Sequence, residues 1–255
     1  MELNKIYNES NLDTMARMPD NFIDLTVTSP PYDNLRTYNG YCFDFENVAK
    51  ELFRVTKQGG VVVWVVSDAT INGSETGTSF KQALYFMQCG FNLHDTMIFR
   101  KKNPIPQIYR KRYNNEFEYM FVFSKGVVKT HNPLMVDCLH AGLELNGTTY
   151  KNYSKNEQTR EKMANPVKAQ KIKGNIWEYV VGTKQEDQEA KGHPAMFPEQ
   201  LANDHILSWS NENDLVYDPF MGSGTTAKMA HIYNRNWIGS EISSEYVELA
   251  NKRLD

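Results

Sequence analysis

The hydrophobic positions of this chain alternate between the spacing of buried strands and the spacing of helices. Mostly apolar runs predict strands at Phe22–Val27, Val61–Val66, Phe91–Phe99, Phe117–Phe123, Leu215–Tyr217 and Trp237–Ser240. Helical spacing predicts helices at Leu12–Met18, Phe45–Lys57, Phe80–Gly90, Pro198–Trp209, Thr225–Tyr233 and Ser244–Leu254. Such alternation predicts an α/β fold, a doubly wound and mostly parallel sheet with ligands at the carboxyl ends of its strands.

The alternation is lost between residues 126 and 192, where the chain is polar, basic and rich in Tyr and Asn. This change of composition divides the chain into residues 1–125, an insertion at 126–192, and residues 193–255. From Arg100 to Lys173 there are 15 Lys and Arg against 6 Asp and Glu, although the whole chain carries a formal charge of −3. A basic middle favours a partner with dense negative charge, while a solvated basic face is the alternative.

Several classes of protein are disfavoured by the composition. No apolar run reaches the ~18 residues of a membrane span, and the amino-terminal residues lack the pattern of a signal peptide. The three cysteines, Cys42, Cys89 and Cys138, are far apart, and the six histidines lack ligand spacing. We therefore expect a cytoplasmic protein with no membrane association and no bound metal.

A glycine loop follows the strand Leu215–Tyr217 and opens the next helix. Gly222, Gly224 and Ala227 match the spacing of a dinucleotide fingerprint, in which glycines let a ligand approach backbone N–H groups at a helix start. Glu241 follows the next strand, where an acid can accept hydrogen bonds from ribose hydroxyls. The loop by itself fits a nicotinamide cofactor and S-adenosylmethionine equally well, because both contain adenosine.

The stretch Thr28-Ser29-Pro30-Pro31-Tyr32 ends the first long strand. A small hydroxyl residue, two prolines and an aromatic ring in this place suit the binding of a flat ring that carries an exocyclic amino group. A hydride-transfer enzyme has no use for such a motif. The pair of motifs therefore favours S-adenosylmethionine as the cofactor and an amine as the methyl acceptor.

Together the two motifs resemble those of the DNA amino-methyltransferases, which methylate N4 of cytosine or N6 of adenine. The catalytic motif comes first and the cofactor motif, Asp218–Thr226, comes last, which is the β arrangement of that family. The resemblance implies catalytic roles for Ser29, Pro30, Pro31 and Tyr32. It implies cofactor contacts from Asp218, Pro219, Phe220, Gly222, Ser223, Gly224, Thr225, Thr226, Glu241, His193 and Phe197.

The same resemblance implies a Rossmann-like methyltransferase domain built from residues 1–125, with the catalytic motif, and 193–255, with the cofactor loop. Residues 126–192 would then be the target-recognition insertion. One departure concerns the Gly-Asp pair that the family often has near the cofactor's adenine, because Glu9-Ser10-Asn11 stands in the comparable place. The adenine contact is therefore not assigned.

The chemistry of the proposed reaction explains why the motif has these residues. The lone pair of a base amine is delocalised into the ring, and two acceptors on its N–H bonds turn it toward the methyl group. The Ser29 hydroxyl oxygen and the Pro30 carbonyl can supply them, and Tyr32 can stack on the base, which contributes roughly 1–3 kcal/mol. The base must be flipped out of the duplex first, at a cost of a few kcal/mol.

Ser29 stands where many relatives have an acid, and this favours N4 of cytosine over N6 of adenine. More distant alternatives are an inactive nucleic-acid-binding module and a methyltransferase acting on RNA or protein. The expected partners are double-stranded DNA and a cognate restriction endonuclease. Cations suited to DNA phosphates are Arg100, Lys101, Lys102, Arg110, Lys111 and Arg112. For Tyr113 and Trp177 core packing is favoured over base stacking. Residues Ser67–Ser79 are rich in Gly, Ser and Thr and predict a loop, in which Asp68 is expected to point at the site; an ordinary surface loop is the alternative.

Overall fold

The computed structural model describes residues 1–31, 43–106, 111–142, 149–151, 160–162, 168–182 and 198–254. Its centre is an eight-stranded sheet in the order β1-β14-β13-β2-β3-β7-β6-β12. The strands are β1 (Lys5–Tyr7), β2 (Ile23–Thr28), β3 (Thr56–Val66), β6 (Asn92–Lys101), β7 (Phe117–Ser124), β12 (Ile176–Tyr179), β13 (Leu215–Asp218) and β14 (Asn236–Ser240). Only β7 among them runs antiparallel to its neighbours, so the predicted mostly parallel sheet is confirmed.

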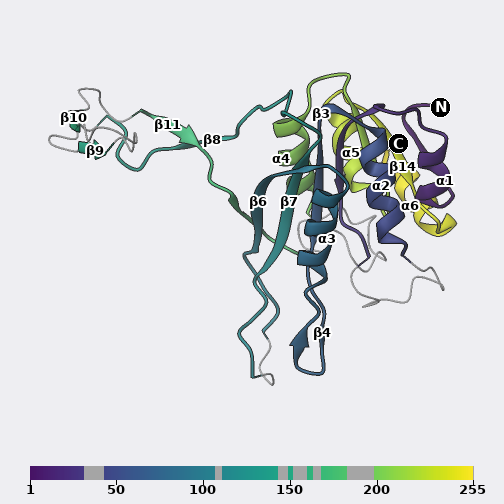
Figure 1. Ribbon diagram of the computed structural model, residues 1–255, viewed down its shortest axis with the longest axis horizontal. Helices are drawn as coiled ribbons and strands as arrows, with labels where there is room; N and C mark the ends of the chain where they lie inside the picture. The colour runs from purple at the N-terminus through teal and green to yellow at the C-terminus, as the bar shows by residue number, and fades with distance from the viewer. Residues whose placement is uncertain are drawn as a thin grey trace. The chain divides into compact units, whose positions relative to one another are not determined.

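Two groups of helices accompany this sheet, and within each group consecutive helices pack on one another (Figure 1). One group is α1 (Asn11–Ala16), α2 (Phe45–Val55) and α3 (Thr78–Gln88); the other is α4 (Glu199–Trp209), α5 (Thr225–Ile232) and α6 (Ser244–Leu254). The burial of β3 shows that both faces of the sheet are covered at this strand. All six residues from Val61 to Val66 are buried, as expected for a central strand with both faces covered. On one face Trp64 stacks edge-on against Phe86 of α3, with ring centroids 5.0 Å apart.

The start of β3 differs from the prediction. The helix that we expected to continue to Lys57 ends at Val55, and the strand begins at Thr56 rather than Val61. The register between β2 and β3 shifts in this stretch, which accommodates the extra residues as an irregularity of the ladder. Gly59 has a left-handed backbone (φ +80°), and its N–H donates to the Lys125 carbonyl. Hydrophobic periodicity cannot predict such a bulge, because the hydrogen bond of Gly59 is made with a residue far away in the sequence.

A small hairpin occupies the segment after β3 that we expected to be a loop. It consists of β4 (Thr70–Ile71) and β5 (Ser74–Glu75). Asp68, at the base of this hairpin, accepts hydrogen bonds from Ser79 N (2.9 Å) and Ser79 Oγ (2.5 Å) at the start of α3. Its carboxylate thus satisfies the Ser79 N–H at this helix start, and its orientation toward the site stays a prediction.

A second compact unit comprises residues 133–174. In it β8 (Met135–Asp137) pairs antiparallel with β11 (Gln170–Ile172), and β9 (Thr149–Lys151) pairs antiparallel with β10 (Arg160–Lys162). The unit covers fewer residues than the predicted insertion, 126–192, because β12 belongs to the main sheet beside β6. A role in target recognition stays a prediction. None of the described helices is long and apolar enough to span a membrane.

Candidate active site

The two sequence motifs lie at the ends of neighbouring strands. β2 and β13 run parallel, with Leu25 opposite Val216 and Thr26 opposite Tyr217, so both strands end at the same edge of the sheet. There the Thr28 hydroxyl donates a hydrogen bond to Asp218 Oδ1 at 2.6 Å. Thr28 directly precedes Ser29, and Asp218 opens the glycine loop. This single bond therefore joins motifs that are 190 residues apart in the chain.

Asp218 is an internal carboxylate, with only 1% of the residue exposed. Its Oδ1 also accepts the N–H of Phe220 at 2.9 Å, which fixes the first turn of the loop. Burial raises the pKa of Asp218 to about 6, although the hydrogen bonds from Thr28 and Phe220 act in the opposite direction. The described bonds of this carboxylate run to the protein itself, and its contact with the cofactor stays a prediction.

The glycine loop has the conformation that its sequence predicts. Gly222 (φ +51°) and Gly224 (φ +82°) both have left-handed backbones, which glycine adopts without steric cost. A Cβ added to Gly224 would lie 2.8 Å from the Cβ of Ala250 in α6. Thr226, in the first turn of α5, donates its hydroxyl to the Val27 carbonyl at 3.2 Å. The loop is thus fixed from two sides, by α6 and by β2.

Glu241 directly follows β14, the strand on the other side of β13. Its two oxygens accept backbone N–H groups, Oε2 from Gly222 and Oε1 from Ser243, both at 2.8 Å. Burial raises the pKa of this carboxyl, and the backbone donors oppose that shift. The strand order β14-β13-β2 therefore arranges Glu241, the glycine loop and Ser29 side by side along one edge.

The catalytic motif is described as far as Pro31. Ser29 is half-buried, Pro30 is buried, and both directly follow the last residue of β2. Several predicted site residues lie outside the described residues, namely Tyr32, Arg110, His193 and Phe197.

Of the predicted phosphate-binding cations, the five that the structure describes lie in or next to the connection between β6 and β7. That connection is at the edge where β2 and β3 end, since Thr28 pairs with Trp64 and Val66 with Tyr119. The group divides into side chains with acidic partners and exposed lysines. Arg100 pairs with Glu178 (2.8 Å), Lys101 with Glu118 (2.8 Å) and Arg112 with Glu75 (3.4 Å). Lys102 and Lys111 are exposed.

Two aromatic residues near this region have different environments. Trp177 is buried beside His205, with ring centroids 4.7 Å apart, so its predicted core packing is confirmed. Tyr113 is 99% exposed, and its predicted core packing is wrong. Its position in a connection between strands, rather than within a strand, leaves it without a sheet face to pack on.

The sequence profile of the N6/N4 DNA methylases matches residues 23–252, which include both motifs and all the strands except β1. The chain belongs to this family. It is a DNA methyltransferase of the amino-methyltransferase type, in a family that uses S-adenosylmethionine.

Relatives extend over nearly the whole chain of this methyltransferase. The orphan methyltransferase M.BamHII of Bacillus amyloliquefaciens is 56% identical over 236 residues, which cover 91% of this chain and 88% of the relative. The DNA adenine methyltransferase YhdJ of Escherichia coli is 41% identical over 96 residues, 38% of this chain and 32% of the relative. Among solved structures, the cytosine-N4-specific PvuII DNA methyltransferase has a TM-score of 0.75 at 20% identity, with 98% of this chain and 86% of that chain covered. The M1.HpyAVI–SAM complex has a TM-score of 0.62 at 23% identity, covering 98% and 99%.

Several residues that support the site of the methyltransferase carry little or no signal in the sequence. Thr28 was part of the catalytic stretch, but nothing in the sequence indicated its bond to Asp218. Asn11, at the start of α1, donates to the Pro219 carbonyl at 3.2 Å and is 3% exposed. Arg253 in α6 reaches the glycine loop. For Arg253 the one available signal is its spacing from Ala250, which puts both residues on the same face of the helix.

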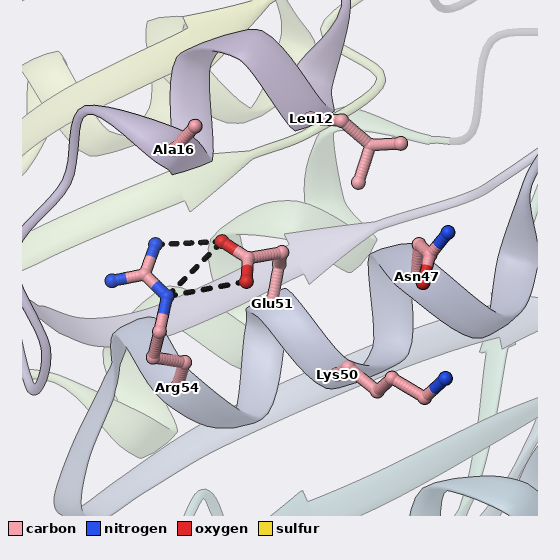
Figure 2. Close-up of a pocket in the computed structure, with 6 residues that line it drawn as sticks. All are labelled: Leu12, Ala16, Asn47, Lys50, Glu51 and Arg54. Atoms are coloured by element: carbon pink, nitrogen blue, oxygen red, sulfur yellow. Dashed lines mark hydrogen bonds and ion pairs between the residues drawn. The ribbon is translucent and has the colours of Figure 1, made fainter.

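A surface pocket between α1 and α2 is distinct from these motifs. Its lining residues are drawn in Figure 2: Leu12, Ala16, Asn47, Lys50, Glu51 and Arg54. Arg54 pairs with Glu51 at 2.6 Å and donates to the carbonyls of Met15 and Met18. These bonds attach the end of α1 to α2, so Arg54 and its partner Glu51 have a structural role.

Proposed function

We propose that this methyltransferase transfers a methyl group from S-adenosylmethionine to N4 of a cytosine flipped out of double-stranded DNA. The observation that carries the proposal is the 2.6 Å hydrogen bond from Thr28 to Asp218. It fixes the start of the Ser29-Pro30-Pro31 motif beside the glycine loop. An acceptor for a base amine and a loop for the methyl donor are thereby neighbours.

The residues at this edge fit the cofactor. The left-handed glycines lack side chains in the turn just before α5, where backbone N–H groups at the helix start can face a ligand. Glu241 uses lone pairs of both oxygens on backbone donors, and the lone pairs that remain can accept ribose hydroxyls. When bound, S-adenosylmethionine supplies an electrophilic methyl group on sulfur.

The catalytic role falls to acceptors rather than to a general base. The Ser29 hydroxyl oxygen and the Pro30 carbonyl accept the two N–H bonds of the base amine and orient its lone pair. The same oxygens stabilise the positive charge that develops on nitrogen, and fixed dipoles are effective because they need no reorganisation. A proton then leaves the methylated amine for water, since that ammonium is strongly acidic.

Serine at position 29 is the reason for preferring cytosine. Its oxygen is a weaker acceptor than the carboxylate that is usual in enzymes acting on adenine. N6 of adenine is the second candidate, and the match to the adenine methyltransferase YhdJ over 96 residues favours it.

The DNA contacts follow from accessibility and charge. Lys102 and Lys111 are exposed at the edge that carries both motifs, so we assign them the first contacts to phosphates, and Arg110 joins them on sequence grounds. Residues 126–192 are proposed to recognise the target sequence. A cognate restriction endonuclease and a cytoplasmic location complete the proposal.

The test is a nucleoside analysis of modified DNA. Unmethylated genomic DNA is incubated with the purified full chain and S-adenosylmethionine carrying a labelled methyl group, then hydrolysed and analysed by mass spectrometry. Labelled N4-methylcytosine is the expected product. N6-methyladenine alone would overturn the choice of base but keep the reaction, and label entering only RNA or protein would overturn DNA as the substrate.

A further inference from the structure

A buried cation of α6, the last helix, donates hydrogen bonds to the glycine loop. Arg253 of α6 has only 1% of its side chain exposed. Its Nη1 donates to the Ser223 carbonyl, to Ser223 Oγ at 3.1 Å and to Thr225 Oγ1 at 3.4 Å. All three acceptors lie between Gly222 and the first turn of α5. The guanidinium therefore contacts the part of the loop that has the left-handed backbone.

Glu199, the first residue of α4, holds this guanidinium in place. Its Oε1 accepts Arg253 Nη2 at 2.7 Å and Lys228 Nζ at 3.0 Å. Lys228 comes from α5, so one carboxylate oxygen joins three helices around the loop. A buried guanidinium keeps its charge, because arginine is not deprotonated in proteins, and it requires such an anion.

The packing of α6 adds a second restraint. Ala250 lies one helical turn before Arg253, and its Cβ is 2.8 Å from the place where a Cβ on Gly224 would be. The small side chain lets the helix approach the backbone of the loop closely. The hydrogen-bonding fork and the close contact thus act on adjacent residues, Ser223 and Gly224.

We propose that Arg253, anchored by Glu199, is a positioning residue that holds the glycine loop ready for the cofactor before any ligand binds. The inference rests on the proposed function of the loop. It goes further by assigning to the end of the chain a share of the affinity for S-adenosylmethionine. The described hydrogen bonds of Arg253 run to Ser223, Thr225 and Glu199, so we expect its effect to be on cofactor binding.

The experiment compares three single variants of the full chain. Arg253→Lys keeps the cation but loses the planar fork, Arg253→Met removes the charge, and Lys252→Met is the matched control on the exposed face of the same helix. Hydrogen–deuterium exchange of the peptide containing residues 218–226 is measured without cofactor. Calorimetry then gives the Kd for S-adenosylmethionine, and fluorescence anisotropy gives the Kd for duplex DNA.

We expect both Arg253 variants to exchange the loop amides faster than the wild type and to bind S-adenosylmethionine at least about tenfold more weakly, since hydrogen bonds to a charged group are lost. DNA affinity and the Lys252→Met control should stay at the wild-type level. If Arg253→Met does not fold, Arg253→Lys decides the matter.

Unchanged exchange in folded Arg253→Lys, or a cofactor Kd within about twofold of the wild type, would overturn the inference, because the lost fork should remove the energy of its charged hydrogen bonds. Equal losses of cofactor and DNA affinity would also overturn it, as they indicate general destabilisation. The exchange measurement needs no cofactor. A failure of the proposed methyl transfer is therefore distinguishable from a failure of this inference.

Discussion

The glycine loop and the connection between β6 and β7 lie at the same edge of the sheet, but they are built in opposite ways. In the loop the polar groups of Asp218, Thr226 and Ser223 are buried and bonded to the protein itself. In the connection the cations are exposed or paired with acids at the surface, as for Arg100 and Glu178. One region has a fixed shape before any ligand binds; the other offers charge to the solvent.

The difference fits what the two proposed ligands would require. A small cofactor must be oriented at one atom, and buried donors and acceptors in fixed positions achieve this because they need little reorganisation. A phosphate backbone attracts cations over a long range and tolerates variable geometry. Substitutions in the two regions should therefore have effects of different size and kind.

The largest effect is expected for Ser29→Ala. Losing one of two acceptors should lower kcat by about 10²–10³-fold, the range seen when one stabilising group of a preorganised site is removed. The Kd for S-adenosylmethionine should stay within about twofold, because the glycine loop is untouched. Single-turnover kinetics and calorimetry measure the two quantities, with Ser74→Ala in the exposed hairpin as the control. Equal losses in both would contradict the role of Ser29 as an acceptor.

A pH-dependent effect is expected for Asp218→Asn. Its raised pKa means that the folded protein holds this proton more tightly than the unfolded chain does. The stability that it contributes is complete below about pH 4 and is lost as the pH rises through about 6. Asparagine does not titrate. The free energy of unfolding of the variant, relative to that of the wild type, should therefore rise between about pH 4 and about pH 7, by at most about 3 kcal/mol. Urea unfolding at several pH values tests this; a difference independent of pH would contradict it.

A smaller loss of stability is expected for Gly224→Ala, about 1–3 kcal/mol from strain and crowding together. The matched control is Gly73→Ala, since Gly73 has a similar φ of +81° and no atom within 4 Å of an added Cβ. The control should show the cost of backbone strain alone. Thermal and urea unfolding measure both variants. Equal losses would show that the contact with Ala250 is unimportant.

The smallest effects are expected in the basic connection. Lys102→Ala and Lys111→Ala should each weaken DNA binding a few-fold and reduce the slope of log K against log salt by about 1. Lys101→Ala should change the slope less, because its ammonium already pairs with Glu118 at 2.8 Å. Anisotropy titrations at several salt concentrations give these slopes. Equal slopes for all variants would show that DNA does not use this edge.

Much of the fold could be predicted from local patterns. The buried runs, such as Val61–Val66, and the helices between them were recognisable because burial on both faces leaves few polar positions. The glycine loop was also predictable, since left-handed residues are so strongly tied to glycine. The four-residue strand β12 and the early start of β3 were not, because both depend on partners far along the chain.

The sequence by itself determined the residue types of the proposed chemistry: Ser29 and Pro30 as candidate acceptors, the glycines of the loop, and Glu241 after the next strand. Only the tertiary structure decided which buried groups hold them. The hydrogen bond from Thr28 to Asp218 joins residues 190 positions apart. The hydrogen bond from Arg253 to Ser223 joins residues 30 positions apart. The physical reason is that hydrogen bonds between distant segments form only when the sheet order and helix packing bring them together, and no local spacing encodes that order.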